Sequence, residues 1–199
     1  MPKQRLSGWG RTAWTVSDTV QPASEAEVRS AVFGAGDRGS IPRGLGRSYG
    51  AAAQNAGGQV LLMAGTPVGA EVSLDRSTGV LTAPAGMSLD DILKFAVPQG
   101  WFVPVTPGTR FVTVGGAIAS DIHGKNHHVA GTFGRHVLRF ELLRSDGQRL
   151  VCSPSAHPEL FAATIGGLGL TGLITWAEVQ LKPVPGPYIA MQAVKFGSL

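Results

Sequence analysis

Three clusters of glycine, at residues 44–50, 108–124 and 166–172, constrain the fold of this chain more than any other feature of its sequence. The 199 residues include 28 glycines and 13 prolines, too many for a helical bundle, and the glycines follow no collagen-like period. Glycine allows close approach of a ligand to the backbone, and consecutive amides in such turns can form a concave anion site. The clusters therefore predict a loop-rich α+β protein whose loops carry the function.

Charge, hydropathy and cysteine content limit the classes of function. The net charge of +4 is spread along the chain, so we expect no nucleic-acid partner, although a basic surface suits anionic lipid headgroups or a phosphorylated substrate. No segment approaches the roughly 18 consecutive apolar residues that span a bilayer, and the basic N-terminus lacks the apolar core of a secretory signal. The single cysteine, Cys152, excludes an internal disulfide, and we interpret it as a buried apolar residue.

Helix and strand signals alternate irregularly along the chain. Ser24 and Ser88 predict the starts of two helices, the first running toward residues 34–36 and the second over 89–96. A third helix is expected over 158–164, and strands over 40–42, 59–63, 80–83, 101–105, 137–143, 149–152 and 173–181. The Asp146-Gly147 dipeptide predicts a hairpin. This order favours two α+β lobes over a doubly wound sheet: a small lobe over about 1–55, a larger lobe over about 56–183, and a connector over 184–199.

The first and third glycine clusters both invite a nucleotide interpretation. In Arg43–Gly50, backbone amides and two arginines could hold a pyrophosphate, although the spacing alone favours an ordinary turn with solvated arginines. Gly167–Gly172 fits the GxGxxG pattern of dinucleotide-binding proteins. That pattern requires a strand before it and a helix after it, whereas here a helix precedes and a strand follows. We therefore reject a Rossmann fold.

Four histidines raise the question of a metal site: His123, His127, His128 and His136. Gly124 and Asn126 are poor in a helix interior, and no cysteine or glutamate completes a recognised ligand set. We predict no metal ion, and we expect the last three histidines to bond backbone groups in loops. Asp121 is expected to cap a turn, with the orientation of a neighbouring group as the alternative.

Five segments together resemble one known family: Ser7–Thr12; Arg43–Gly50 with Gln54-Asn55; Asp121–His128 with Gly131–Gly134; Thr164–Gly167; and Gly169–Gly172. They are similar to the FAD-binding part of the vanillyl-alcohol-oxidase-like FAD oxidoreductases. The resemblance covers nearly the whole chain and is strongest to the bacterial members that act on decaprenylphosphoryl-β-D-ribose. Two positions depart from the pattern: Ala51 stands where the family usually has Asp, and Ser120 where the most similar members have Cys.

This resemblance implies a two-lobed FAD-binding domain of the PCMH type. It implies non-covalent FAD, because Tyr49 stands where some relatives carry a flavin-linked histidine. It places His123 beside the isoalloxazine ring, as the one catalytic candidate in this chain. The residues that it places at the cofactor are Pro42, Arg43, Gly44, Leu45, Gly46, Arg47, Ser48, Tyr49, Gly50, Ala51, Ala52, Gly108, Thr113, Val114, Gly115, Gly116, Ser120, Asp121, Ile122, His123 and, through its backbone, Ile174.

The implied activity is oxidation of the ribose 2-hydroxyl of this lipid-linked sugar to a ketone, in bacterial cell-wall arabinan synthesis. A quinone is the implied electron acceptor, a reductase is the implied partner for an epimerisation, and the location is cytoplasmic or at the cell envelope, including its periplasmic face, with peripheral membrane contact. The substrate pocket and a catalytic lysine are expected in a separate domain absent here, so the chain is a fragment or is completed by a partner chain. Two alternatives stay open: an oxidase of an alditol, aldonolactone or hydroxy acid, and a flavin-binding fragment without catalysis.

Overall fold

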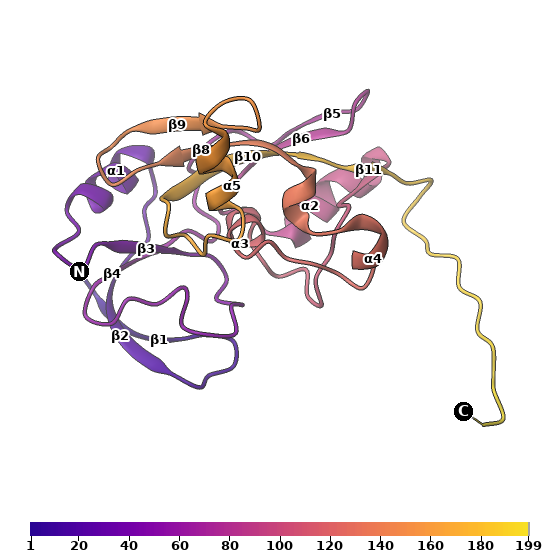
Figure 1. Cartoon of the computed structure of the whole chain (residues 1–199), viewed down its shortest axis with the longest axis horizontal. Helices are drawn as coiled ribbons and strands as arrows, with labels where there is room; N and C mark the ends of the chain where they lie inside the picture. The colour runs from indigo at the N-terminus through magenta and orange to yellow at the C-terminus, as the bar shows by residue number, and fades with distance from the viewer. Residues whose placement is uncertain (199) are drawn as a thin grey trace.

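The computed structural model describes residues 1–198 as two large β-sheets, with helices around and between them, and one two-stranded antiparallel sheet of β7 (Trp101–Phe102) and β11 (Lys182–Pro183) (Figure 1). The first sheet has the strand order β1-β2-β4-β3. Its strands are β1 (Lys3–Ser7), β2 (Trp14–Val20), β3 (Ser40–Arg43) and β4 (Gln59–Leu62). β1 and β2 are antiparallel, whereas β4 runs parallel to both β2 and β3. Helix α1 (Glu25–Phe33) connects β2 to β3.

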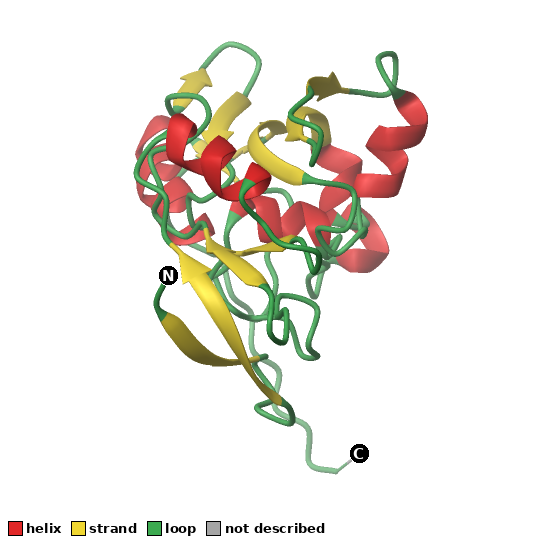
Figure 2. Cartoon of the chain, turned by 90° about the vertical axis from the view of Figure 1, so that its left-hand side faces the viewer, coloured by secondary structure: helices red, strands yellow, loops and turns green. Residues whose placement is uncertain are grey.

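The second sheet is wholly antiparallel and has the order β5-β6-β10-β8-β9. Its strands are β5 (Ser73–Asp75), β6 (Val80–Pro84), β8 (Val137–Leu143), β9 (Arg149–Cys152) and β10 (Leu173–Gln180). The remaining elements are α2 (Leu89–Ala96), η1 (Val97–Gln99), β7 (Trp101–Phe102), α3 (Val114–Ala119), α4 (His127–Ala130), η2 (Phe133–His136), α5 (Pro158–Thr164) and β11 (Lys182–Pro183). Figure 2 shows the first sheet at one end of the molecule, with most of the helices above it.

A large apolar core lies between the second sheet and the helices. β10 is its central strand, and Ile174, Ala177 and Val179 are buried there. α3 packs against it with Ala117 and Ile118 fully buried. Because Gly115 has no side chain, α3 can approach β6 closely: a Cβ at this position would lie 3.1 Å from the Cβ of Ala85.

A smaller apolar cluster joins the two sheets. It combines Val28 and Ala31 of α1 and Leu61 of β4 with Leu143 of β8 and Leu173 of β10. α1 therefore connects two strands of the first sheet, and it packs against residues of both sheets.

Several elements follow the sequence closely. The helices expected after Ser24 and Ser88 begin where predicted, and each serine side chain accepts the N–H three residues on. The helix over 158–164 and the hairpin across Asp146-Gly147 are also present. These local signals are confirmed, and the mixture of helices with two sheets confirms the α+β class.

Other elements differ from the prediction. Small residues over 51–58 indicated a lobe boundary near residue 55, but β4 pairs with β2 and β3, so the first sheet extends to Leu62. Those small residues form a connection within that sheet. The sequence also missed β1 and β2, and it treated 114–119 as turns where the structure has helix α3.

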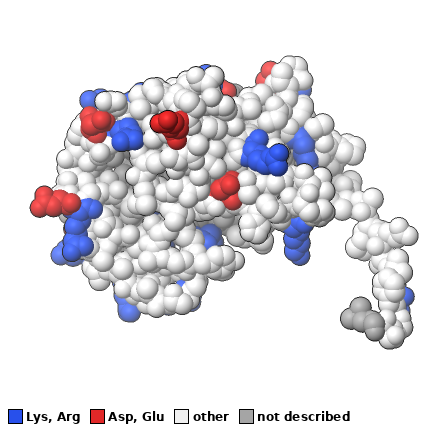
Figure 3. All heavy atoms as spheres, viewed as in Figure 1, with Lys and Arg blue, Asp and Glu red and all other residues white. Residues whose placement is uncertain are grey.

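Charge is dispersed over the visible surface. On the face shown in Figure 3, Lys and Arg side chains are scattered among neutral residues, with Asp and Glu between them. Among the described residues, no helix is long and apolar enough to cross a membrane.

Candidate cofactor site

The loop that follows β3 carries an uninterrupted series of free backbone amides. From Leu45 to Ala53, no N–H group donates a hydrogen bond to any residue within the described 1–198 range. The loop is nevertheless half-buried as far as Ser48. Partly buried amides need an acceptor, and consecutive free N–H groups in a turn can form a concave site for an anion.

Two arginines add positive charge to this loop. The Arg43 guanidinium donates to the carbonyl oxygens of Ala53, at 3.0 Å, and Ser7, at 2.7 Å, and so holds the loop closed. Arg47 donates to the Leu45 carbonyl at 2.7 Å, and its guanidinium lies 4.7 Å from the centroid of a Trp9 ring. Burial, and secondly the charge of Arg47, lower the pKa of Arg43. In the described part of the chain neither arginine forms an ion pair, so the charge available here suits a pyrophosphate.

The second glycine cluster contributes a helix whose first amides are already bonded. Thr113 caps α3, its Oγ1 accepting the Gly116 N–H at 3.2 Å. The Val114 N–H donates to the Met87 carbonyl and the Gly115 N–H to the Ala85 carbonyl, both at 2.9 Å. These amides of α3 therefore do not form the anion site that glycine-rich turns in this segment could have supplied.

The third glycine cluster, at residues 166–172, bonds the C-terminal end of α3. The Gly166 N–H donates to the Ile118 carbonyl at 3.0 Å, and the Leu168 N–H donates to the Ala119 carbonyl at 2.8 Å. Leu168 has a positive φ of 54°, uncommon for a residue with a side chain. The GxGxxG match thus caps a helix C-terminus, which agrees with the rejection of a Rossmann site.

The three clusters are neighbours in space. A Cβ on Gly44 would overlap the Thr113 side chain, so the first loop lies directly against the start of α3. A Cβ on Gly169 would lie 3.2 Å from Cγ of Pro42, so the third loop lies against the end of β3. The N-terminal Ser7–Thr12 segment also contacts this site, because the Trp9 N–H donates to the Ser48 carbonyl at 2.7 Å. The predicted cofactor residues did not include Ser7–Thr12. The resemblance of this segment to the family was the sequence signal that could have placed it at the site.

Asp121 and His123 follow α3. Asp121, with a φ of 40°, accepts the Gly134 N–H at 2.8 Å through Oδ1, so it bonds the first turn of η2 and not the turn in which it lies, where the sequence favoured a cap. His123 is exposed, and its ring lies edge-on to that of His127 with centroids 5.5 Å apart. His136 Nε2 bonds the Ala130 carbonyl at 2.9 Å, so the expected backbone bond is present, although His136 ends the 3-10 helix η2 and does not lie in a loop. The same expectation was wrong for His127 and His128: they lie in α4, and neither side chain bonds a backbone group of the described residues. Within residues 1–198, no three His, Cys, Asp or Glu side chains are arranged to hold a metal ion.

The remaining predicted site residues differ in accessibility. Tyr49, Gly50, Ala51, Gly108 and Ser120 are exposed around the loop and α3. Val114 has its side chain in the core, and so does Ile174, which lies opposite Leu142 in the second sheet. Those two side chains do not face a ligand, which leaves only their backbone for a contact.

The free amides, the two arginines without an ion pair among the described residues, and the α+β fold without a Rossmann unit suit a ligand that carries phosphate groups. A family profile described as "FAD binding domain" matches residues 17–153. The chain belongs to this family, and FAD is its cofactor. The residues described above fit the group, since the N–H groups of Leu45–Ala53 have no acceptor among the described residues and two arginines lie beside them.

Comparison with individual proteins gives the same result. The chain is 47% identical to decaprenylphosphoryl-beta-D-ribose oxidase of Mycolicibacterium smegmatis over 98% of its own length and 43% of that protein. It is 33% identical to cytokinin dehydrogenase 4 of Arabidopsis thaliana over 72% of its length and 28% of that protein. A putative D-arabinono-1,4-lactone oxidase of Neurospora crassa is 31% identical over 57% of the chain and 20% of the fungal protein. The chain thus spans less than half the length of each of these relatives.

Proposed function

We propose that the Leu45–Ala53 amides and the charges of Arg43 and Arg47 bind the FAD pyrophosphate non-covalently. The supporting observation is the series of free amides beside two arginines without carboxylate partners. Gly44 of this loop lies against Thr113 at the start of α3, and His123 follows the end of α3. We place the isoalloxazine ring along α3, between the loop and His123. Tyr49, 81% exposed, stands where some relatives attach the flavin through a histidine, and a tyrosine cannot form that histidyl bond.

We further propose that the protein oxidises the ribose 2-hydroxyl of decaprenylphosphoryl-β-D-ribose to a ketone. The identity of 47% over nearly the whole chain to an oxidase of that substrate carries this proposal. FAD, when bound, supplies the hydride acceptor. His123 is the side chain that we place nearest the ring, where it would orient the ring and stabilise negative charge.

The wider setting follows from the same relative. We propose a quinone as the terminal electron acceptor, a reductase partner that completes an epimerisation, and a place at the bacterial cell envelope with peripheral membrane contact. These roles suit a lipid-linked sugar, whose polyprenyl chain keeps it in the membrane.

A second candidate is an aldonolactone oxidase. The 31% identity to a putative D-arabinono-1,4-lactone oxidase favours it. Ala51 and Ser120 favour it too, because both positions depart from the pattern of the resembled family. Both candidates require the same FAD cradle, so only the substrate distinguishes them.

The experiment is to purify the protein and to supply decaprenylphosphoryl-β-D-ribose or D-arabinono-1,4-lactone with a soluble quinone. The expected result is loss of two hydrogens from the ribose sugar, seen by mass spectrometry, with stoichiometric quinone reduction. Oxidation of the lactone alone would replace the first candidate with the second. Acid precipitation should leave the flavin in the supernatant, and flavin retained in the pellet would contradict non-covalent binding.

A further inference from the structure

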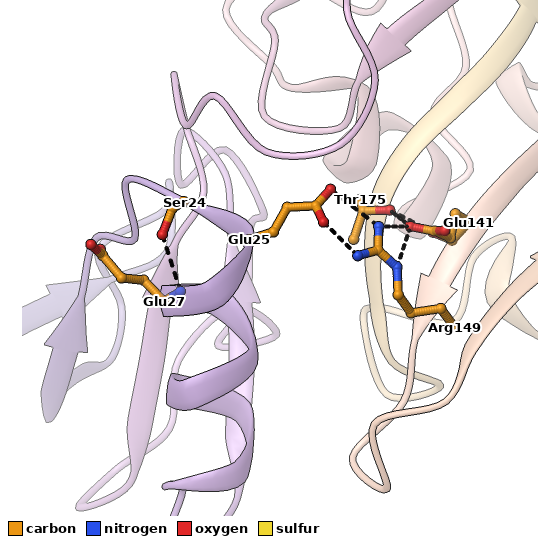
Figure 4. A network of polar contacts seen from close by, with 6 residues as sticks. All are labelled: Ser24, Glu25, Glu27, Glu141, Arg149 and Thr175. Carbon is orange, nitrogen blue, oxygen red and sulfur yellow. Dashed lines mark hydrogen bonds and ion pairs between the residues drawn. The ribbon is translucent and has the colours of Figure 1, made fainter.

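A network of charged and polar side chains fastens α1 to the second sheet (Figure 4). Arg149 of β9 is its centre. It donates to both carboxylate oxygens of Glu25 at the start of α1, at 2.6 and 3.2 Å. It also donates twice to Oε1 of Glu141 on β8, at 3.1 and 2.6 Å. Glu25 is thus the member of the network on α1, the helix that connects two strands of the first sheet.

The network continues to the helix that borders the cofactor loop. The Thr175 hydroxyl donates to Oε1 of Glu141 at 2.6 Å. The Thr175 carbonyl accepts the Ala85 N–H at 2.9 Å, and the Ala85 carbonyl accepts the Gly115 N–H of α3 at 2.9 Å. A continuous series of polar contacts therefore runs from α1, through the second sheet, to the first turn of α3.

Apolar packing beside the network is incomplete. A cavity of about 160 Å³ lies there, lined by Val28, Val68 and Leu143 together with Glu25, Arg149 and Thr175. At the far end of α1, the Phe33 ring lies so close to Gly147 that a Cβ on the glycine would overlap it. α1 is therefore held at its C-terminal end by an aromatic contact and at its N-terminal end by the ion pair.

The two halves of the FAD cradle lie on the two parts that this network joins. The Leu45–Ala53 loop follows β3 of the first sheet, whereas α3 packs on β10 of the second. A bidentate arginine–carboxylate pair fixes direction as well as distance, because both groups are planar. Resting on the pyrophosphate site proposed above, we propose that Glu25 and Arg149 are positioning residues for FAD: they set how the first sheet packs against α3, and thereby the spacing between the amide loop and Thr113.

The test compares two substitutions on one turn of α1. Glu25→Gln removes the charge that Arg149 binds across the interface. Glu27→Gln is the matched control, because the Glu27 side chain bonds, among the described residues, only the Ala23 N–H just before its own helix, at 2.9 Å, and glutamine can still accept there. FAD dissociation constants are measured by flavin fluorescence quenching, and thermal melting of each apoprotein is measured separately.

We expect Glu25→Gln to weaken FAD binding by roughly 2–5-fold, the range for a partly exposed ion pair, and Glu27→Gln to leave it unchanged. In an Arg149→Met background, Glu25→Gln should add nothing further, because the partner is already gone. Equal dissociation constants for wild type and Glu25→Gln would overturn the proposal. So would a lower melting temperature of Glu25→Gln without a change in FAD affinity, since the pair would then serve stability alone.

Discussion

At the scale of single residues, two glycines of the loop after β3 allow the proposed site to be tested. Gly44 and Gly50 lie at either end of the same loop, yet their surroundings differ. A Cβ on Gly44 would overlap Thr113, whereas a Cβ on Gly50 would meet nothing within 4 Å. Neither glycine has a positive φ, so space alone distinguishes them.

Gly44→Ala should therefore destabilise the protein by about 1–3 kcal/mol, the usual cost of overpacking, and should weaken FAD binding because Thr113 caps α3. Gly50→Ala should leave both quantities close to wild type. Urea unfolding and FAD titration measure the two effects. Equal losses from both substitutions would show that the loop does not lie against α3.

His123 and His128 provide a second comparison at this scale, because both are exposed and neither packs in the core. His123→Ala should weaken FAD binding by roughly 2–10-fold, the range for loss of one hydrogen bond, and should lower the flavin reduction potential. His128→Ala should change neither. Spectroscopic redox titration of the FAD-bound variants measures the flavin reduction potential. Identical potentials in His123→Ala and His128→Ala would show that His123 does not act on the flavin.

At the scale of elements, short polar turns and caps decide where strands and helices end. The β5–β6 turn is held by Asp75, whose carboxylate accepts from the Ser77 hydroxyl at 2.6 Å, the Ser77 N–H at 2.8 Å and the Thr78 hydroxyl at 2.8 Å. These donors, the Ser77 hydroxyl first, lower the pKa of Asp75 from 3.8 to about 2. The turn is therefore tied to the charged form of one exposed carboxyl.

A depressed carboxyl pKa stabilises the folded state above the unfolded value and loses that contribution as pH falls. The part of the unfolding free energy due to Asp75 should thus be complete above about pH 4 and should disappear toward pH 2. Asp75→Asn should lack this part of the acid loss. Asp37→Asn, at an exposed carboxylate with no hydrogen bond or ion pair to the residues described, should keep the wild-type profile. Urea unfolding between pH 2 and 5 measures both curves, and parallel profiles for Asp75→Asn and wild type would contradict the assignment.

Elements with local signals could be predicted from the sequence, and elements fixed by distant contacts could not. Ser24, Ser88 and Asp146-Gly147 act on their own neighbours, so their helices and hairpin were found. α3 was missed because Gly115 and Gly116 disfavour a helix. Its first amides are fixed by the carbonyls of Ala85 and Met87, nearly thirty residues earlier in the chain. β1 and β2 pair without a tight turn between them, which removes the usual hairpin signal.

At the scale of the whole molecule, the two large sheets carry the two sides of the cofactor site that we propose. The resemblance predicted the family and the cofactor, and both are confirmed. The residues of the site remain a proposal, but the geometry divides them: the first glycine cluster offers free amides, while the second and third use theirs to begin and end α3. That division could not be predicted from the sequence, because all three clusters have the same glycine-rich composition.

We expect the FAD phosphates to bind the Leu45–Ala53 amides and not the GxGxxG segment. Hydrogen exchange of individual amides, followed by NMR with and without FAD, tests it most directly. Without FAD the Leu45–Ala53 amides lack protein acceptors and should exchange fast, and several should become protected when FAD is added. The Gly166 and Leu168 amides, already bonded to α3, should change little. Protection that appears at Gly167–Gly172 while Leu45–Ala53 stays unprotected would contradict the account.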